Sequence, residues 1–62
     1  MATETQIQAI QEYLYIHDNP NVETHMKLYY KAAARGNPML YTNTLTWLEK
    51  DYYDLYREGL IQ

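Results

Sequence analysis

Apolar residues recur at the spacing of a helical turn in three segments, which two Asn-Pro dipeptides, Asn19-Pro20 and Asn37-Pro38, separate. Asn is favoured before a helix because its side chain accepts hydrogen bonds from free backbone N–H groups, and Pro fits the first helical position. No segment shows the alternation of apolar and polar residues that is typical of a strand. The pattern predicts one all-α domain over residues 1–62, a small three-helix bundle.

The first helix is expected from Glu4 to His17. Thr3 and Gln6 have the spacing of a capping box, in which each side chain bonds the other residue's backbone N–H. At about 100° per residue, several apolar side chains fall on one side of this helix. The packing face is expected to comprise Ile7, Ile10, Leu14 and His17, flanked by Tyr13.

The second helix is expected to begin at Pro20 and to include the run Ala32–Ala34, which has high helix propensity. Glu23 lies four residues before Lys27, the favourable order for an ion pair on a helix surface. The expected packing face comprises Val22, Met26, Tyr29, Tyr30 and Ala33.

The third segment carries the strongest periodic pattern, with apolar residues at alternating steps of four and three. Its start is ambiguous, because the threonines after Pro38 are poor helix formers and Thr46 with Glu49 forms a second capping-box match. A continuous helix over 38–58 and a short helical turn over 38–42 before a longer helix both fit. The packing face is expected to comprise Tyr41, Leu45, Leu48, Tyr52 and Leu55.

Both glycines follow helical segments, where a left-handed residue commonly ends a helix. Gly36 is expected to end the second helix and Gly59 the third. Leu60, directly after Gly59, is placed to make the apolar contact of a Schellman cap.

The chain of 62 residues contains no Cys and no Ser, which excludes disulfides, thiolate metal sites and Ser or Cys nucleophiles. No run approaches the roughly 20 apolar residues of a membrane span, and the polar stretch after Met1 is unlike a signal peptide. We therefore expect a cytoplasmic protein that does not enter a membrane. A core this small also predicts that a partner or self-association contributes to stability.

The third helix places a tryptophan among carboxylates, in an arc that we expect opposite its packing face. A large amphipathic ring surrounded by charge is typical of a binding hot spot and its rim. In the alternative, the ring covers the edge of the core and the acids only face solvent. This acidic Trp face comprises Leu40, Trp47, Asp51, Asp54 and Glu58.

Eight Tyr and no Phe form the most unusual feature of the composition. A domain of this size cannot bury all of these rings, and Tyr provides rigid contact area at binding surfaces. Tyr15, Tyr53 and Tyr56 lie off the expected packing faces and are candidate contacts for a partner. Alternatively, the rings extend an undersized core.

The second helix carries a basic stripe, Lys27, Lys31 and Arg35, at successive steps of four residues. It is an alternative binding face or a plain solvated surface. Because acidic and basic faces lie on different helices, a two-fold or head-to-tail homo-oligomer that joins them is a further possibility.

Other functional classes find less support in the sequence. Ala32 and Gly36 have the separation of a helix-turn-helix, but Arg35 and Asn37 beside the glycine are polar and residues 38–49 contain no Lys or Arg. The net charge of −3 also weighs against nucleic acid. His17 and His25 lie eight residues apart across the first Asn-Pro break, so no metal or other cofactor is expected.

The carboxylates of the third helix are predicted on a convex face without a pocket, so no catalytic residues are assigned and no enzyme activity is expected. The sequence favours a non-enzymatic protein-binding module. It would be a small regulator, adaptor or inhibitor docking on a larger protein that has a basic, partly apolar surface. The short length also suggests a phage or mobile-element origin. The alternatives are a helix-turn-helix-like nucleic-acid-binding protein and a self-assembling structural subunit.

Overall fold

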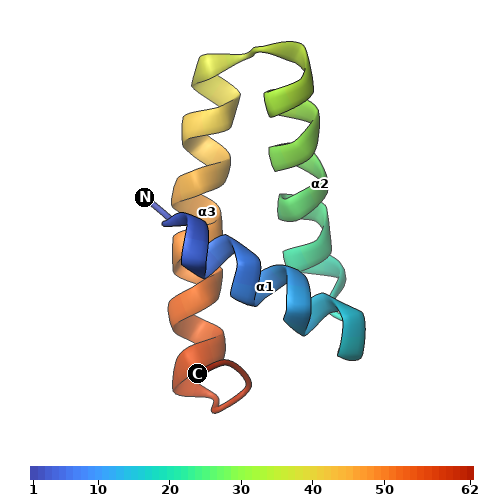
Figure 1. The fold of residues 1–62 in the computed structure, drawn as a ribbon, viewed down its shortest axis with the longest axis vertical. Helices are drawn as coiled ribbons and strands as arrows, with labels where there is room; N and C mark the ends of the chain where they lie inside the picture. The colour runs from blue at the N-terminus through green and yellow to red at the C-terminus, as the bar shows by residue number, and fades with distance from the viewer.

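The computed structural model describes all 62 residues and contains three helices: α1 (Glu4–Ile16), α2 (Pro20–Arg35) and α3 (Pro38–Arg57). Helices α2 and α3 form a long antiparallel hairpin, and α1 crosses one face of this hairpin (Figure 1). The chain contains no strand. The predicted all-α three-helix bundle is confirmed. No helix combines the length and the apolar character that crossing a bilayer would demand.

The residues that precede the helices cap them as predicted. The Thr3 hydroxyl accepts from the Gln6 N–H (3.2 Å), and the Gln6 side-chain oxygen accepts from the Thr3 N–H (3.0 Å). Asn19 and Asn37 each accept from the backbone N–H three residues later, at 3.3 and 3.1 Å. These short polar side chains therefore define where each helix begins.

Two helix boundaries are decided by local geometry. Helix α3 is continuous from Pro38, so the alternative with a separate short turn is wrong. The hydroxyls of Thr44 and Thr46 donate to carbonyls one turn earlier (2.7 and 3.2 Å), so both hydroxyls have hydrogen-bond partners inside the helix. Helix α1 ends at Ile16, one residue earlier than predicted, because the backbone of His17 is extended.

Both glycines adopt left-handed conformations, with φ of 64° at Gly36 and 76° at Gly59. After α3, the Gly59 N–H donates to the Tyr56 carbonyl and the Leu60 N–H to the Leu55 carbonyl, the two bonds of a Schellman cap. Leu60, which is predicted to make the apolar contact of this cap, stays 43% exposed, whereas Ile61 is buried against the core. The cap turns the chain so that the second residue after the glycine points inward.

The core lies where α1 crosses the hairpin. Helix α1 covers only the part of α2 and α3 that is farther from the α2–α3 turn (Figure 1). Nearer the turn, α2 packs on α3 alone, so Ala32 is buried and Ala33, predicted to be in the core, is exposed. Tyr30 and His17 are likewise exposed rather than buried in the core. The buried cluster comprises Ile7, Ile10, Tyr13, Val22, Met26, Leu48, Leu55 and Ile61.

Candidate protein-binding face

Trp47 lies in the middle of α3, beside α2. Its ring centroid is 5.6 Å from that of His25 on α2, and the two planes are inclined at 34°. The residue nevertheless remains 37% exposed. Trp47 is therefore supported by α2 on one side and open to solvent on the other.

Asp51 lies one turn after Trp47 and belongs to the contact between the two helices. Its Oδ2 is 2.6 Å from Nδ1 of His25, and its side chain is only 14% exposed. The expectation that Asp51 stands on an outer face is therefore wrong. The carboxylate instead holds the imidazole of His25 in place against the indole of Trp47.

The acidic Trp face does not lie opposite the packing face of α3. Helix α3 packs against α1 on one side and α2 on another, so its buried arc is wider than the predicted stripe and includes the fully buried Thr44. Leu40, half-buried, and Trp47 lie at the edge of this arc, beside α2. The face is thus on the side of the hairpin turned away from α1.

Charged residues at the far end of this face are already partly paired. Asp54 contacts Lys50 at 2.8 Å and Arg57 at 3.1 Å. The hydrogen bond from the Lys50 ammonium lowers the pKa of Asp54, and the same bond raises the pKa of Lys50. Glu58, directly after α3, is exposed and makes no ion pair.

Tyr53 and Tyr56 are exposed but lie apart from Trp47. Along α3 they are rotated from it by about 120° and 180°. Both pack around Tyr52, with ring centroids at 5.6 and 6.2 Å. The structure therefore does not bring these two tyrosines into the acidic Trp face. Tyr15, at the end of α1, is also exposed.

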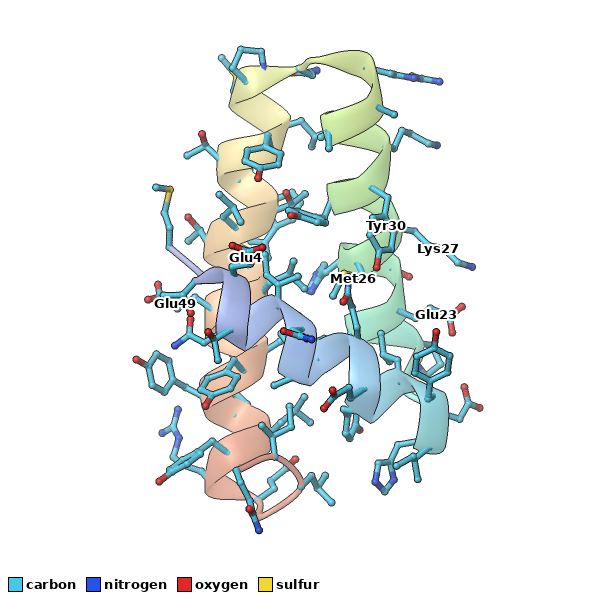
Figure 2. All side chains as sticks on the ribbon, viewed as in Figure 1. Glu4, Glu23, Met26, Lys27, Tyr30 and Glu49 are labelled. Atoms are coloured by element: carbon cyan, nitrogen blue, oxygen red, sulfur yellow. The ribbon has the colours of Figure 1, made fainter.

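The basic stripe of α2 is divided by its ion pairs. Lys27 contacts Glu23 at 3.0 Å, as predicted, on the outer edge of α2 (Figure 2). Lys31 and Arg35 are exposed and make no ion pair. Since the other cationic side chains of Lys and Arg are paired, two remain for contact with phosphates, which weighs against a nucleic-acid role.

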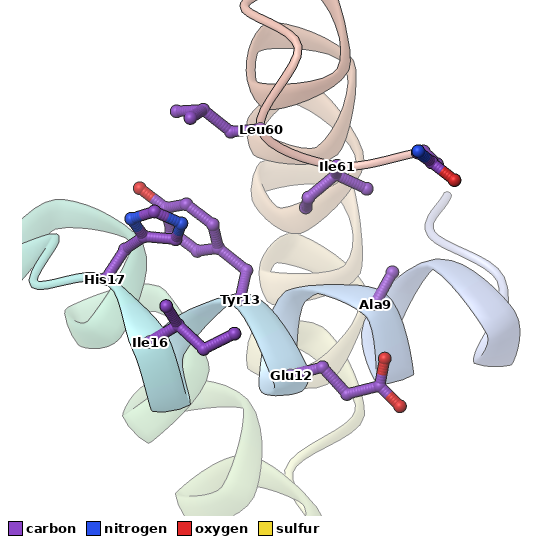
Figure 3. A pocket seen from close by; sticks show the side chains of 8 residues that line it. Ala9, Glu12, Tyr13, Ile16, His17, Leu60 and Ile61 are labelled. Atoms are coloured by element: carbon purple, nitrogen blue, oxygen red, sulfur yellow. The ribbon is translucent and has the colours of Figure 1, made fainter.

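A hollow of about 280 Å³ lies between the last turns of α1 and the segment after α3 (Figure 3). His17 stacks on Tyr13 there, with ring centroids 4.7 Å apart, and exposed Ile16 and Leu60 stand at its edge. The spacing of residues along the chain does not predict this hollow, because its two sides are far apart in the sequence.

Comparison of the chain with protein-family models, curated proteins and solved structures found no match. Within the structure, His, Asp and Glu side chains form no group of three that could hold a metal ion. We therefore infer a function from the surfaces of this molecule.

Proposed function

We propose that this chain is a non-enzymatic protein-binding module, a small regulator, adaptor or inhibitor that docks on a larger protein through the acidic Trp face. One observation carries the proposal. Trp47 is 37% exposed while His25, itself held by Asp51, supports the inner side of its ring. A large aromatic side chain that is ordered before binding loses little conformational entropy when a partner covers it.

The surroundings of Trp47 define the partner. Half-buried Leu28 of α2 and Leu40 of α3 extend the apolar area on the side away from α1. Glu58 supplies an unpaired negative charge just after α3, and Asp54, one turn earlier, shares its charge with Lys50 and Arg57. A matching partner has an apolar pocket for the indole, and basic residues beside it that steer association.

The test compares Trp47→Ala with Tyr53→Ala, which removes an exposed aromatic ring elsewhere on α3. Binding to a partner captured from lysate is measured by calorimetry, and folding by circular dichroism. Trp47→Ala is expected to weaken binding by about 2 kcal/mol or more, mainly through faster dissociation. Tyr53→Ala should bind normally. If Trp47→Ala binds normally but unfolds more easily, Trp47 belongs to the core and the basic stripe becomes the candidate interface.

Self-association is a second candidate function, favoured by the positions of the charges along the two helices of the hairpin. Lys31 and Arg35 lie toward the α2–α3 turn, whereas Asp54 and Glu58 lie at the other end of the hairpin. A two-fold pair related by an axis perpendicular to the helices would bring these cations onto these acids. Light scattering distinguishes the two candidates: self-association predicts a mass that rises with protein concentration and falls with salt.

A further inference from the structure

A second hollow, of about 340 Å³, lies beside the start of α1. It is bounded by the N-terminal segment, by α1 and by both helices of the hairpin. None of its lining residues carries a positively charged side chain. We name it the tyrosine pocket, and it is lined by Ala2, Glu4, Ile7, Tyr29, Tyr41 and Leu45.

Two aromatic rings form one side of the tyrosine pocket. Tyr29 of α2 and Tyr41 of α3 are half-buried, with ring centroids 5.3 Å apart and planes inclined at 31°. Tyr30 packs against Tyr29 at 5.6 Å and further restricts its ring. The π faces of such rings carry negative potential and attract cations.

Glu4 adds a full negative charge to this aromatic wall. It lies in the first turn of α1, and its carboxylate has no ion-pair partner. The neighbouring N-terminal ammonium is bound by Glu49 at 3.1 Å (Figure 2). The pKa of Tyr29 is raised to about 12, first by its hydrogen bond with the Tyr41 side chain, then by burial and by the charges of Tyr41 and Tyr30, and least by the charge of Glu4.

We propose that the tyrosine pocket binds an organic cation: an ammonium or guanidinium group on a short aliphatic stem, as presented by a Lys or Arg side chain or by a free amine. The carboxylate of Glu4 and the faces of Tyr29 and Tyr41 attract the charge. Ile7 and Leu45 offer apolar surface to the stem. An anion would meet Glu4 without any compensating positive charge in the pocket.

This site is independent of the proposed docking through Trp47, because neither Trp47 nor its neighbour His25 lines the pocket. The pocket could be occupied whether or not the acidic Trp face binds a protein. Its test therefore uses the chain alone and small probes.

The experiment titrates n-butylammonium and n-butylguanidinium into the full chain and follows the NMR signals of Ile7, Leu45 and the tyrosine rings. Butan-1-ol, a neutral molecule of the same size, and sodium chloride at equal ionic strength are the reference titrations. We expect saturable changes in the NMR signals of the pocket residues with the two cations, and no such changes with butan-1-ol or sodium chloride. Equal shifts with butan-1-ol would overturn the proposal and show a merely apolar hollow.

Glu4→Gln keeps the size of the side chain and removes its charge. Glu12→Gln is the matched control, since Glu12 is also exposed on α1, makes no ion pair and lies outside the pocket. Glu4→Gln should weaken cation binding about fivefold or more, and Glu12→Gln should leave it unchanged. Equal affinities for the two variants would refute the role of Glu4 and with it the proposed site.

A lysine tripeptide with blocked termini tests whether the pocket accepts the cation of a side chain or only that of a free amine. If it binds as tightly as butylammonium, the pocket accepts a side chain carried on another protein. If butylammonium binds and the peptide does not, the pocket selects free amines. Absence of binding by all three cationic probes would overturn the proposal.

Discussion

Replacement of Leu48 by Ala removes a side chain from the place where α1 crosses α3. Leu48 is 0% exposed and belongs to the cluster that joins all three helices. Leu→Ala at such a site loses both the transfer free energy of the deleted carbons and the contacts around the resulting cavity. We expect the free energy of unfolding to fall by about 3 kcal/mol.

This loss is large for a chain of 62 residues. At about 0.05 to 0.15 kcal/mol per residue, the whole domain is stable by about 3 to 9 kcal/mol. A domain of this size loses about 4 to 8 °C of Tm per kcal/mol, so Leu48→Ala should lower Tm by about 12 to 24 °C. At the low end of this stability range the variant is half unfolded at room temperature.

Thermal and urea unfolding, followed by circular dichroism, measure the effect. Leu60→Ala is the matched control, because it makes the same chemical change at a residue that is 43% exposed. It should cost less than about 1 kcal/mol. If the two variants lose the same stability, Leu48 does not occupy the centre of the core and the packing of α1 on α3 described above is wrong.

Three further predictions concern backbone and titration. Gly36→Ala places a Cβ on a residue with φ 64° and should lower the free energy of unfolding in urea by about 1 to 2 kcal/mol. Gly36→Asn should lower it less. Equal stability of the original protein and both variants would contradict the left-handed cap. Asn37→Ala removes the cap of α3 and should cost about 1 kcal/mol in the same assay, whereas no loss would show that water replaces it. Because the pKa of Tyr29 is raised from 10.0 to about 12, its contribution to stability is present below pH 10 and lost as pH rises toward 12. Ultraviolet titration should show one late tyrosine, which Tyr41→Phe returns toward 10.

Local features of this protein followed from the sequence alone. Thr3, Asn19 and Asn37 cap their helices and both glycines end theirs, because these interactions join residues within a few positions of one another. The buried positions Leu48 and Leu55 were also predicted, since the side of a helix on which a residue lies depends only on its periodicity. The sequence showed that Trp47 lies among acids on α3, but it did not determine how far the ring is exposed.

The packing of the helices decided the rest. Ala32 rather than Ala33 is buried because α1 stops short of the α2–α3 turn, a matter of where one helix crosses another. Asp51 binds His25 in the contact between α2 and α3, and not on the predicted outer face, because α2 widens the buried arc of α3. The tyrosine pocket joins residues from all three helices, so no spacing along the chain could reveal it. Periodicity states which side of a helix is apolar, whereas only the crossing of helices determines how far along that side burial extends.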